Sequence, residues 1–230
     1  MPASKEHVLE NLSLIRASIA RAADRAGRDT ADVTLVAAAK TVGAEPIRWV
    51  AQAGVRAIGE NYVSELREVR AELAAVPLRW HYIGVLQSGT AHHVADLVDV
   101  VETVAGERAA RRLAGRAARS GRVVDALIEV DFTGERSGVS PEDAAAAARS
   151  ITSLEGLRLC GLMTLPPVGR TAEDARPWFV RLRELRDRLR EDHPDVAELS
   201  MGMSSDFQVA VEEGATMVRV GTALFGPRAP

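Results

Sequence analysis

The first hydrophobic pattern along the chain is helical. Val8, Leu12, Ile15 and Ile19 are spaced by four, three and four residues, which places them on one face of an α-helix. Gly27 follows this pattern, and glycine is common just beyond the end of a helix. The spacing predicts an amphipathic helix over residues 4–26.

Beyond this helix, short apolar runs alternate with stretches of helical pattern. Strands are predicted at 33–39, 56–59, 80–84, 98–101, 124–130, 157–163, 197–201 and 217–221. Helices are predicted at 44–53, 61–74, 89–96, 106–119, 140–150, 172–192 and 205–213. This alternation is typical of a parallel sheet whose strands are joined by crossover helices.

Eight strand–helix units in 230 residues predict an α/β fold, a (β/α)8 TIM-type barrel with an extra N-terminal helix packing on it. We expect a single domain over residues 1–230, because no linker rich in Pro, Gly or Ser interrupts the alternation. An open doubly wound sheet is the alternative. The barrel is favoured because no Gly-x-Gly-x-x-Gly follows the first predicted strand.

In such a barrel, the loops at the carboxyl ends of the strands hold the functional site. Polar and glycine-rich segments of this chain fall at these ends, so all of them are predicted on one rim. The segments are Lys40, Gly59-Glu60-Asn61, residues 84–87, 163–167 and 202–206, and Gly221-Thr222.

Lysine is rare in the chain. Of 29 Lys and Arg residues, only Lys5 and Lys40 are lysine. A guanidinium group stays protonated, so arginine cannot replace lysine where chemistry needs a neutral amine. Because Lys40 lies at the end of the first predicted strand, we interpret it as a required amine that can form a Schiff base with an aldehyde.

The last two loops have the pattern of a phosphate-binding site. Ser204 and Ser205 begin a predicted helix, and Gly221-Thr222 form a turn of small residues after a buried strand. Barrels commonly bind phosphate at the loops after strands seven and eight, and glycine lets the backbone approach an anion. Two ordinary turns are the alternative. Together with a lysine on the same rim, these loops indicate an aldehyde cofactor that carries phosphate.

Arg219 lies within an apolar strand. It faces the barrel interior if Met217, Arg219 and Gly221 alternate inward, and a buried arginine is costly without a partner. A cation near Lys40 would favour the neutral amine. The alternative is a structural ion pair between Arg219 and an acid such as Glu60 or Asp206.

Composition narrows the class of protein. Apolar residues make up 47% and charged residues 27% of the chain, a balance typical of globular domains. With a net charge of −3, the chain is not basic, as nucleic-acid-binding proteins typically are. A single cysteine excludes an intrachain disulfide framework, and no apolar span reaches membrane length. We expect a cytoplasmic protein with no nucleic-acid or membrane partner.

Several segments match one family together: Ala39–Thr41, Gly59–Tyr62, Trp80–Gln87, Gly161–Met163, Leu199–Asp206 and Gly214–Gly226. With them the chain resembles, over nearly its whole length, the YggS/PROSC-type pyridoxal-phosphate homeostasis proteins, relatives of the alanine racemase N-terminal barrel. The combination is specific, whereas a lone Arg-x-Gly-Thr would not be.

The resemblance implies that the cofactor is pyridoxal 5′-phosphate (PLP) and that Lys40 holds it as an internal aldimine. The other cofactor-binding residues that it implies are Asn61 beside the ring, Arg219 facing the pyridine nitrogen, and Ser204, Gly221 and Thr222 at the phosphate. In relatives an Asn-Lys pair usually follows Leu86-Gln87 and position 42 is sometimes lysine, whereas this chain has Ser88-Gly89-Thr90 and Val42. Any role of those lysines therefore cannot be carried over.

A cation facing the pyridine nitrogen keeps it unprotonated and weakens the ring as an electron sink. Racemases related to this barrel also use an acid–base residue from a second domain, which we do not expect here. The resemblance therefore implies intracellular PLP homeostasis without robust turnover, with no catalytic residue. We expect a monomer that passes PLP to PLP-dependent apoenzymes. A PLP-dependent racemase or other Schiff-base enzyme is the alternative, and an interaction scaffold is a third class.

Histidines raise the question of a metal site. His92 and His93 begin a predicted helix and lack a nearby Cys or carboxylate at ligand spacing, so we predict no metal site. For His81, near a strand end, a hydrogen-bonding role is expected.

Overall fold

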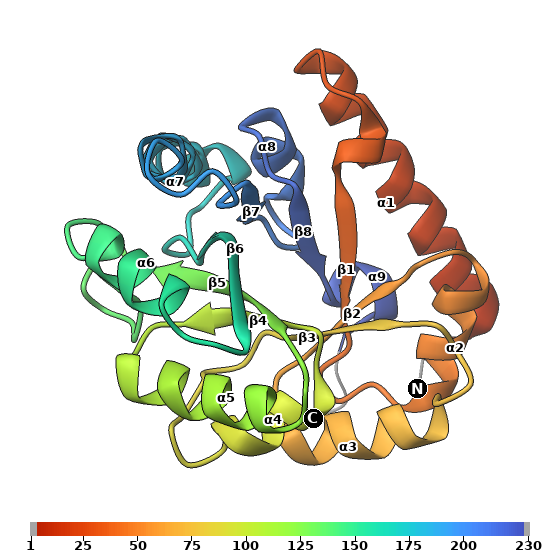
Figure 1. Ribbon diagram of the computed structural model, residues 1–230. Coiled ribbons are helices and arrows are strands. Elements are labelled where there is room, and N and C mark those ends of the chain that lie inside the picture. Colours follow the sequence, from red (N-terminus) through yellow and green to blue (C-terminus); the bar gives the residue numbers. More distant parts are fainter. Residues whose placement is uncertain (1–3, 228–230) are drawn as a thin grey trace.

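The computed structural model describes residues 4–227 and shows a closed barrel of eight parallel strands (Figure 1). The strands follow one another in chain order, and the first pairs with the last, with Val36 opposite Arg219. The predicted TIM-type barrel is therefore confirmed. The strands are β1 (Thr34–Ala38), β2 (Ala57–Glu60), β3 (Arg79–Tyr82), β4 (Val100–Val104), β5 (Val124–Val130), β6 (Leu157–Thr164), β7 (Glu198–Ser200) and β8 (Met217–Val220).

Helices surround the barrel, at least one after each strand. They are α1 (Lys5–Arg25), α2 (Ala44–Gln52), α3 (Val63–Glu72), α4 (Ala91–Leu97), α5 (Glu107–Arg119), α6 (Ala144–Thr152), α7 (Arg176–Leu189), α8 (Phe207–Glu212) and α9 (Thr222–Phe225), with 3₁₀ turns η1 (Thr30–Asp32) and η2 (Ala172–Ala175). The predicted N-terminal helix is α1, which packs on α2, α8 and α9. In Figure 1, β1 and β8 run side by side, and α9 lies at the end toward which they run.

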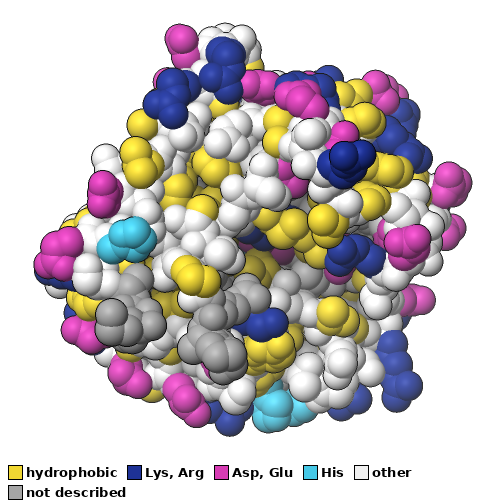
Figure 2. Space-filling view, turned by 180° about the vertical axis from the view of Figure 1, so that it is seen from behind, with side chains coloured by type: hydrophobic (Ala, Val, Ile, Leu, Met, Phe, Trp, Pro, Cys, Tyr) yellow, Lys and Arg dark blue, Asp and Glu magenta, His cyan; other side chains and the backbone are white. Residues whose placement is uncertain are grey.

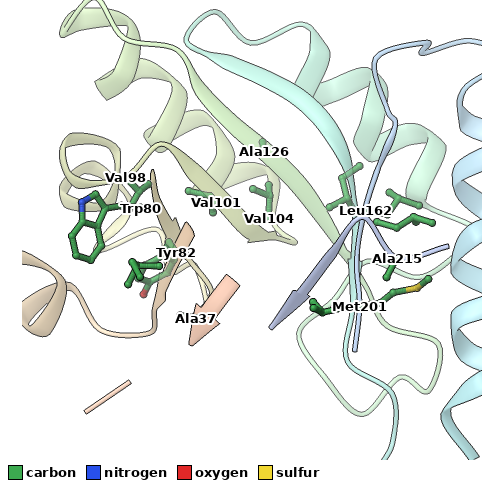
Figure 3. Packing of buried hydrophobic residues seen from close by; sticks show 14 of the residues in the cluster. Ala37, Trp80, Tyr82, Val98, Val101, Val104, Ala126, Leu162, Met201 and Ala215 are labelled. Carbon is green, nitrogen blue, oxygen red and sulfur yellow. The ribbon is translucent and has the colours of Figure 1, made fainter. Parts of the chain in front are cut away.

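The main apolar core lies between the strands and the surrounding helices (Figure 3). Trp80 and Tyr82 of β3, Val101 of β4 and Leu162 of β6 belong to it. A smaller apolar set lies inside the barrel and includes Val36, Ala57 and Met217. Because side chains alternate along a strand, Arg219 faces the interior like Met217, as predicted.

The arginine-rich segment shows how the helical layer is held. The buried stripe of α7 consists of Phe179, Leu182, Leu185 and Leu189, and burying each side chain contributes about 1.5–3 kcal/mol. On its other side, Arg176 forms ion pairs with Glu173, Glu212 and Glu213. Arg176 thus ties the start of α7 to the end of α8 and to the preceding turn.

The surface carries charges of both signs. From behind, basic and acidic side chains are interspersed and gather in no single patch (Figure 2). Within residues 4–227, no helix is long and apolar enough to cross a membrane.

Element boundaries differ from the predictions at a few points. β4 begins at Val100, two residues after the predicted start of 98–101, because Val98 still caps α4. The predicted helix 172–192 is divided into η2 and α7. Pro177 lies in the first turn of α7, where its missing N–H is no loss. Helix α9 was not predicted, since four residues are too few to show a helical period.

Candidate functional site

Lys40 lies at the rim of the barrel, two residues beyond the end of β1. Its side chain is half-buried, and Nζ lies 5.0 Å from the centroid of the Tyr62 ring. A cation over an aromatic face is attracted by the electrons of the ring. Lys5, the other lysine, is exposed at the start of α1. Only Lys40 therefore places a side-chain amine at the rim.

The turn after Lys40 has an unusual backbone. Thr41 has φ 61°, and it is the one non-glycine residue within the range 4–227 that has a positive φ. This conformation is uncommon for β-branched residues. The N–H of Thr41 donates a hydrogen bond of 2.9 Å to Glu65 Oε2 in α3. Glu65 therefore ties the turn that carries Lys40 to the neighbouring helix.

Asn61 lies beside this turn on the same rim. It follows β2, which pairs with β1, and the N–H of Ala39 donates to Gly59 O at 2.8 Å. A side chain at Gly84 would overlap the Asn61 carbonyl group, so only glycine allows the two loops to approach this closely. Lys40 and Asn61 therefore lie on neighbouring loops of the same rim.

The loops after β7 and β8 meet as predicted. Ser204 Oγ accepts a hydrogen bond of 3.2 Å from the N–H of Ala223. Asp206 Oδ1 accepts one of 2.6 Å from the N–H of Met203, which fixes the first of the two loops. The exposed Thr222 begins α9 directly after Gly221. Two hydroxyl groups, from Ser204 and Thr222, therefore flank one small region of the rim.

Gly221 brings this region against the strand that leads to Lys40. A Cβ atom at position 221 would lie 2.9 Å from the Ala38 carbonyl oxygen, which is closer than carbon and oxygen tolerate. The backbones of β8 and β1 approach at this point because residue 221 has no side chain. The amine of Lys40 and the hydroxyl groups of Ser204 and Thr222 consequently share one side of the rim.

Arg219 is buried inside the barrel, below this region. Its Nη1 donates to Ser200 Oγ at 2.5 Å and its Nη2 to the Thr164 carbonyl at 2.9 Å. The nearest carboxylate oxygen is Glu102 Oε2, 3.7 Å from Nη1. Burial lowers the pKa of Arg219, and the charges of nearby carboxylates oppose that shift.

The ion-pair partner of Arg219 is thus Glu102, and neither acid suggested by the sequence takes this position. Asp206 acts on Arg219 only through its charge. Glu60 is fully buried, and both of its carboxyl oxygens lack hydrogen-bond partners within residues 4–227. Burial, and then the charge of Glu65, raise the pKa of Glu60 to about 8, so this carboxyl group is mostly protonated at neutral pH.

The histidines occupy two different settings. His81 is buried, and its Nδ1 lies 2.7 Å from Glu102 Oε1, which confirms the expected hydrogen-bonding role. His92 and His93 lie together on α4, with ring centroids 3.9 Å apart. No group of three potential metal ligands occurs in the described part of the chain.

Sequence reasoning missed Glu102 and Ser200. Glu102 is a single acid within the apolar run Val100–Val104, and Ser200 lies among the buried residues of β7. A lone buried charge requires a partner, and that signal could have identified Glu102. Its partners could not have been identified in this way, because they come from β3, β7 and β8.

Comparisons with known proteins identify the family of this chain. The family model for the alanine racemase N-terminal domain matches residues 11–229. The chain is 41% identical to the pyridoxal phosphate homeostasis protein of Aquifex aeolicus, covering 95% of this chain and 97% of that protein. Its counterpart in Pseudomonas aeruginosa is also 41% identical, with 96% of each chain covered.

Solved structures show the same similarity. PipY of Synechococcus elongatus, a structure with PLP bound, superimposes with a TM-score of 0.85 at 34% identity and covers 95% of this chain and 100% of that one. An alanine racemase of Clostridium difficile shares the fold with a TM-score of 0.77 at 17% identity. The match covers 98% of this chain but 58% of that enzyme.

Proposed function

Because this chain belongs to the family of pyridoxal phosphate homeostasis proteins, we propose that it binds PLP at the rim of the barrel and takes part in PLP homeostasis. When bound, PLP supplies an aldehyde that condenses with a primary amine, and Lys40 is the amine that would take this role. The protein holds the cofactor in this way without robust turnover of its own.

One observation carries the proposal. The contact between Gly221 and Ala38, together with the Ser204–Ala223 hydrogen bond, brings the loop of Lys40 next to two loops with hydroxyl groups. An amine beside hydroxyl and backbone N–H donors suits an aldehyde that also carries a phosphate group. Ser204, Gly221 and Thr222 would hold the phosphate.

Two further residues suit the ring of the cofactor. Asn61 is adjacent to Lys40 on the rim and would lie beside the ring. Arg219, buried inside the barrel, would donate a hydrogen bond to the pyridine nitrogen. An arginine cannot give up its proton to that nitrogen. The nitrogen therefore stays unprotonated, which disfavours the carbanion chemistry that a racemase needs.

The cellular setting follows from the same proposal. PLP-dependent apoenzymes are the recipients that we propose for the held cofactor, and the protein acts as a cytoplasmic monomer with a single barrel domain over residues 1–230. The net charge of −3 and the mixed surface charges suit neither nucleic acid nor an anionic membrane.

Absorbance spectra with a matched pair of lysine variants test this function. Wild-type protein incubated with PLP should gain a visible band that disappears on borohydride reduction, which should fix the cofactor on residue 40 as seen by mass spectrometry. Lys40→Ala should lose the band, whereas Lys5→Ala should keep it, since Lys5 is exposed on α1. A wild-type protein that remains colourless would contradict the proposal.

Turnover is tested separately. The PLP-loaded protein is incubated with a panel of L-amino acids, and the products are separated by chiral chromatography. We expect no inversion at enzymatic rates. Rapid appearance of D-amino acids would instead favour the racemase.

A further inference from the structure

A buried chain of polar side chains crosses the barrel interior beneath the rim. It consists of His81 on β3, Glu102 on β4, Ser200 on β7 and Arg219 on β8, and each is at most 4% exposed. Glu102 accepts at both carboxylate oxygens, at 2.7 Å from His81 Nδ1 and 2.5 Å from Ser200 Oγ. A buried network is energetically favourable only if its members are satisfied, and of these four side chains only His81 has a buried atom, Nε2, without a partner within residues 4–227.

The charge of Glu102 sets the direction of these hydrogen bonds. Burial alone would raise the pKa of Glu102, but the hydrogen bonds and charges of His81, Arg219 and Ser200 hold it below its ordinary value. An ionised carboxylate only accepts hydrogen bonds. The Ser200 hydroxyl must therefore donate to Glu102, which leaves its lone pairs for Arg219.

This direction matters for Arg219. A guanidinium group has five N–H donors in one plane. One is fixed by Ser200 Oγ, and another is fixed by the Thr164 carbonyl at the end of β6. Two anchors on different strands fix the orientation of the plane. The remaining N–H groups of the Arg219 guanidinium, which these two bonds do not use, are thereby held in fixed orientations.

We propose that Glu102, acting through the Ser200 hydroxyl, is a positioning residue that orients Arg219 toward the pyridine nitrogen of PLP. The inference rests on the proposed function, because it assigns a task to residues that would not touch the cofactor themselves. In Glu102→Gln, the amide group can donate, so the Ser200 hydroxyl is no longer forced to present its lone pairs to Arg219. The ring would then lose a well-aligned donor.

A double-mutant cycle tests this coupling. PLP affinity and the absorption maximum of the bound cofactor are measured for Glu102→Gln, Ser200→Ala and the double variant. Each single change should weaken PLP binding about tenfold, and each should shift the absorption maximum. The double variant should be no weaker than the weaker single variant, because both changes break the same connection.

Asp125→Asn is the matched control. Asp125 is another buried carboxylate, on β5, and it pairs with Arg79 and Arg158 rather than with Arg219. This variant should melt at a lower temperature without PLP but keep the affinity and spectrum of the wild type. Ser200→Ala keeps every charge, so it provides a second test if Glu102→Gln fails to fold.

The outcomes separate the two proposals. Wild-type protein that binds PLP, with variants of unchanged affinity and spectrum, overturns the positioning role alone. A loss of PLP affinity of about a hundredfold in the double variant also overturns it, because the free-energy changes of independent substitutions are additive. A wild-type protein that does not bind PLP overturns the proposed function, and the positioning role with it.

Discussion

The hydroxyl group of Ser204 accepts a hydrogen bond of 3.2 Å from the backbone N–H of Ala223. This bond joins the loop after β7 to the start of α9, two segments that are 19 residues apart in the chain. The closing side of the barrel rim is therefore one connected surface rather than two independent turns.

Ser204→Ala should weaken PLP binding with little loss of stability. The variant loses a hydroxyl group at the proposed phosphate site and the link to Ala223, and we expect the dissociation constant to rise about tenfold. Titration of the visible band measures this change. Ser205→Ala is the control, because Ser205 is the exposed next residue. Equal effects of the two substitutions would contradict the assignment of Ser204.

Gly221→Ala should destabilise the protein through one contact. The added methyl group would lie 2.9 Å from the Ala38 carbonyl oxygen, and backbone atoms on paired strands cannot move aside easily. We expect a loss of about 1–3 kcal/mol in the free energy of unfolding, measured by urea denaturation. Gly89→Ala should be nearly neutral, because no atom lies within 4 Å of the corresponding Cβ.

Glu60 should make stability depend on pH. Its pKa is about 8 in the folded protein, compared with an ordinary value of 4.5, so the folded state binds more protons than the unfolded state between these values. The free energy of unfolding should therefore fall as pH rises from about 4.5 to about 8, by at most about 1.4 kcal/mol per pH unit from this group.

Denaturation of wild type and Glu60→Gln at pH 5, 6.5 and 8 would isolate the contribution of Glu60. The variant should lack this decline and should exceed the wild type in stability most clearly at the highest pH. Glu68→Gln, a change at an exposed position of the next helix, should keep the wild-type profile. Parallel curves for wild type and Glu60→Gln would refute the buried titration.

Glu65→Ala should loosen the turn that carries Lys40. Thr41 is held at φ 61° with its N–H bonded to Glu65, and loss of an exposed hydrogen bond of this kind costs about 0.5–1.5 kcal/mol. Because this bond is exposed to solvent, we expect only a slightly lower melting temperature, together with slower appearance of the visible band after mixing with PLP. Glu68→Ala on the same helix provides the comparison. Unchanged loading kinetics would show that the turn does not depend on Glu65.

Much of the fold could be predicted from hydrophobic patterning. Runs such as Val124–Val130, apolar except for Asp125 and Glu129, reflect that both faces of a barrel strand are covered, and short runs of this kind marked all eight strands. Short helix α9 and the division between η2 and α7 were not predicted, since a four-residue helix and a change of helix type leave no distinct period in the sequence.

The candidate site could be predicted only in part. Lys40, Asn61, Ser204 and Gly221 follow strands, so the barrel topology alone gathers them at one rim. Glu102 is different, because it contacts residues from three other strands, and its bond with Ser200 spans 98 positions. Such pairings depend on which inward side chains meet at one height in the barrel, and a single sequence does not record that.

The scarcity of lysine also limits where on the protein a free aldehyde can react. Free aldehydes condense with accessible primary amines, and a protein with many lysines would collect such adducts at random. Here the charged exterior is almost entirely guanidinium and carboxylate, and Lys5 is the one exposed side-chain amine outside the rim. The molecule can therefore remain soluble through its charges and still offer a reactive aldehyde very few places to bond.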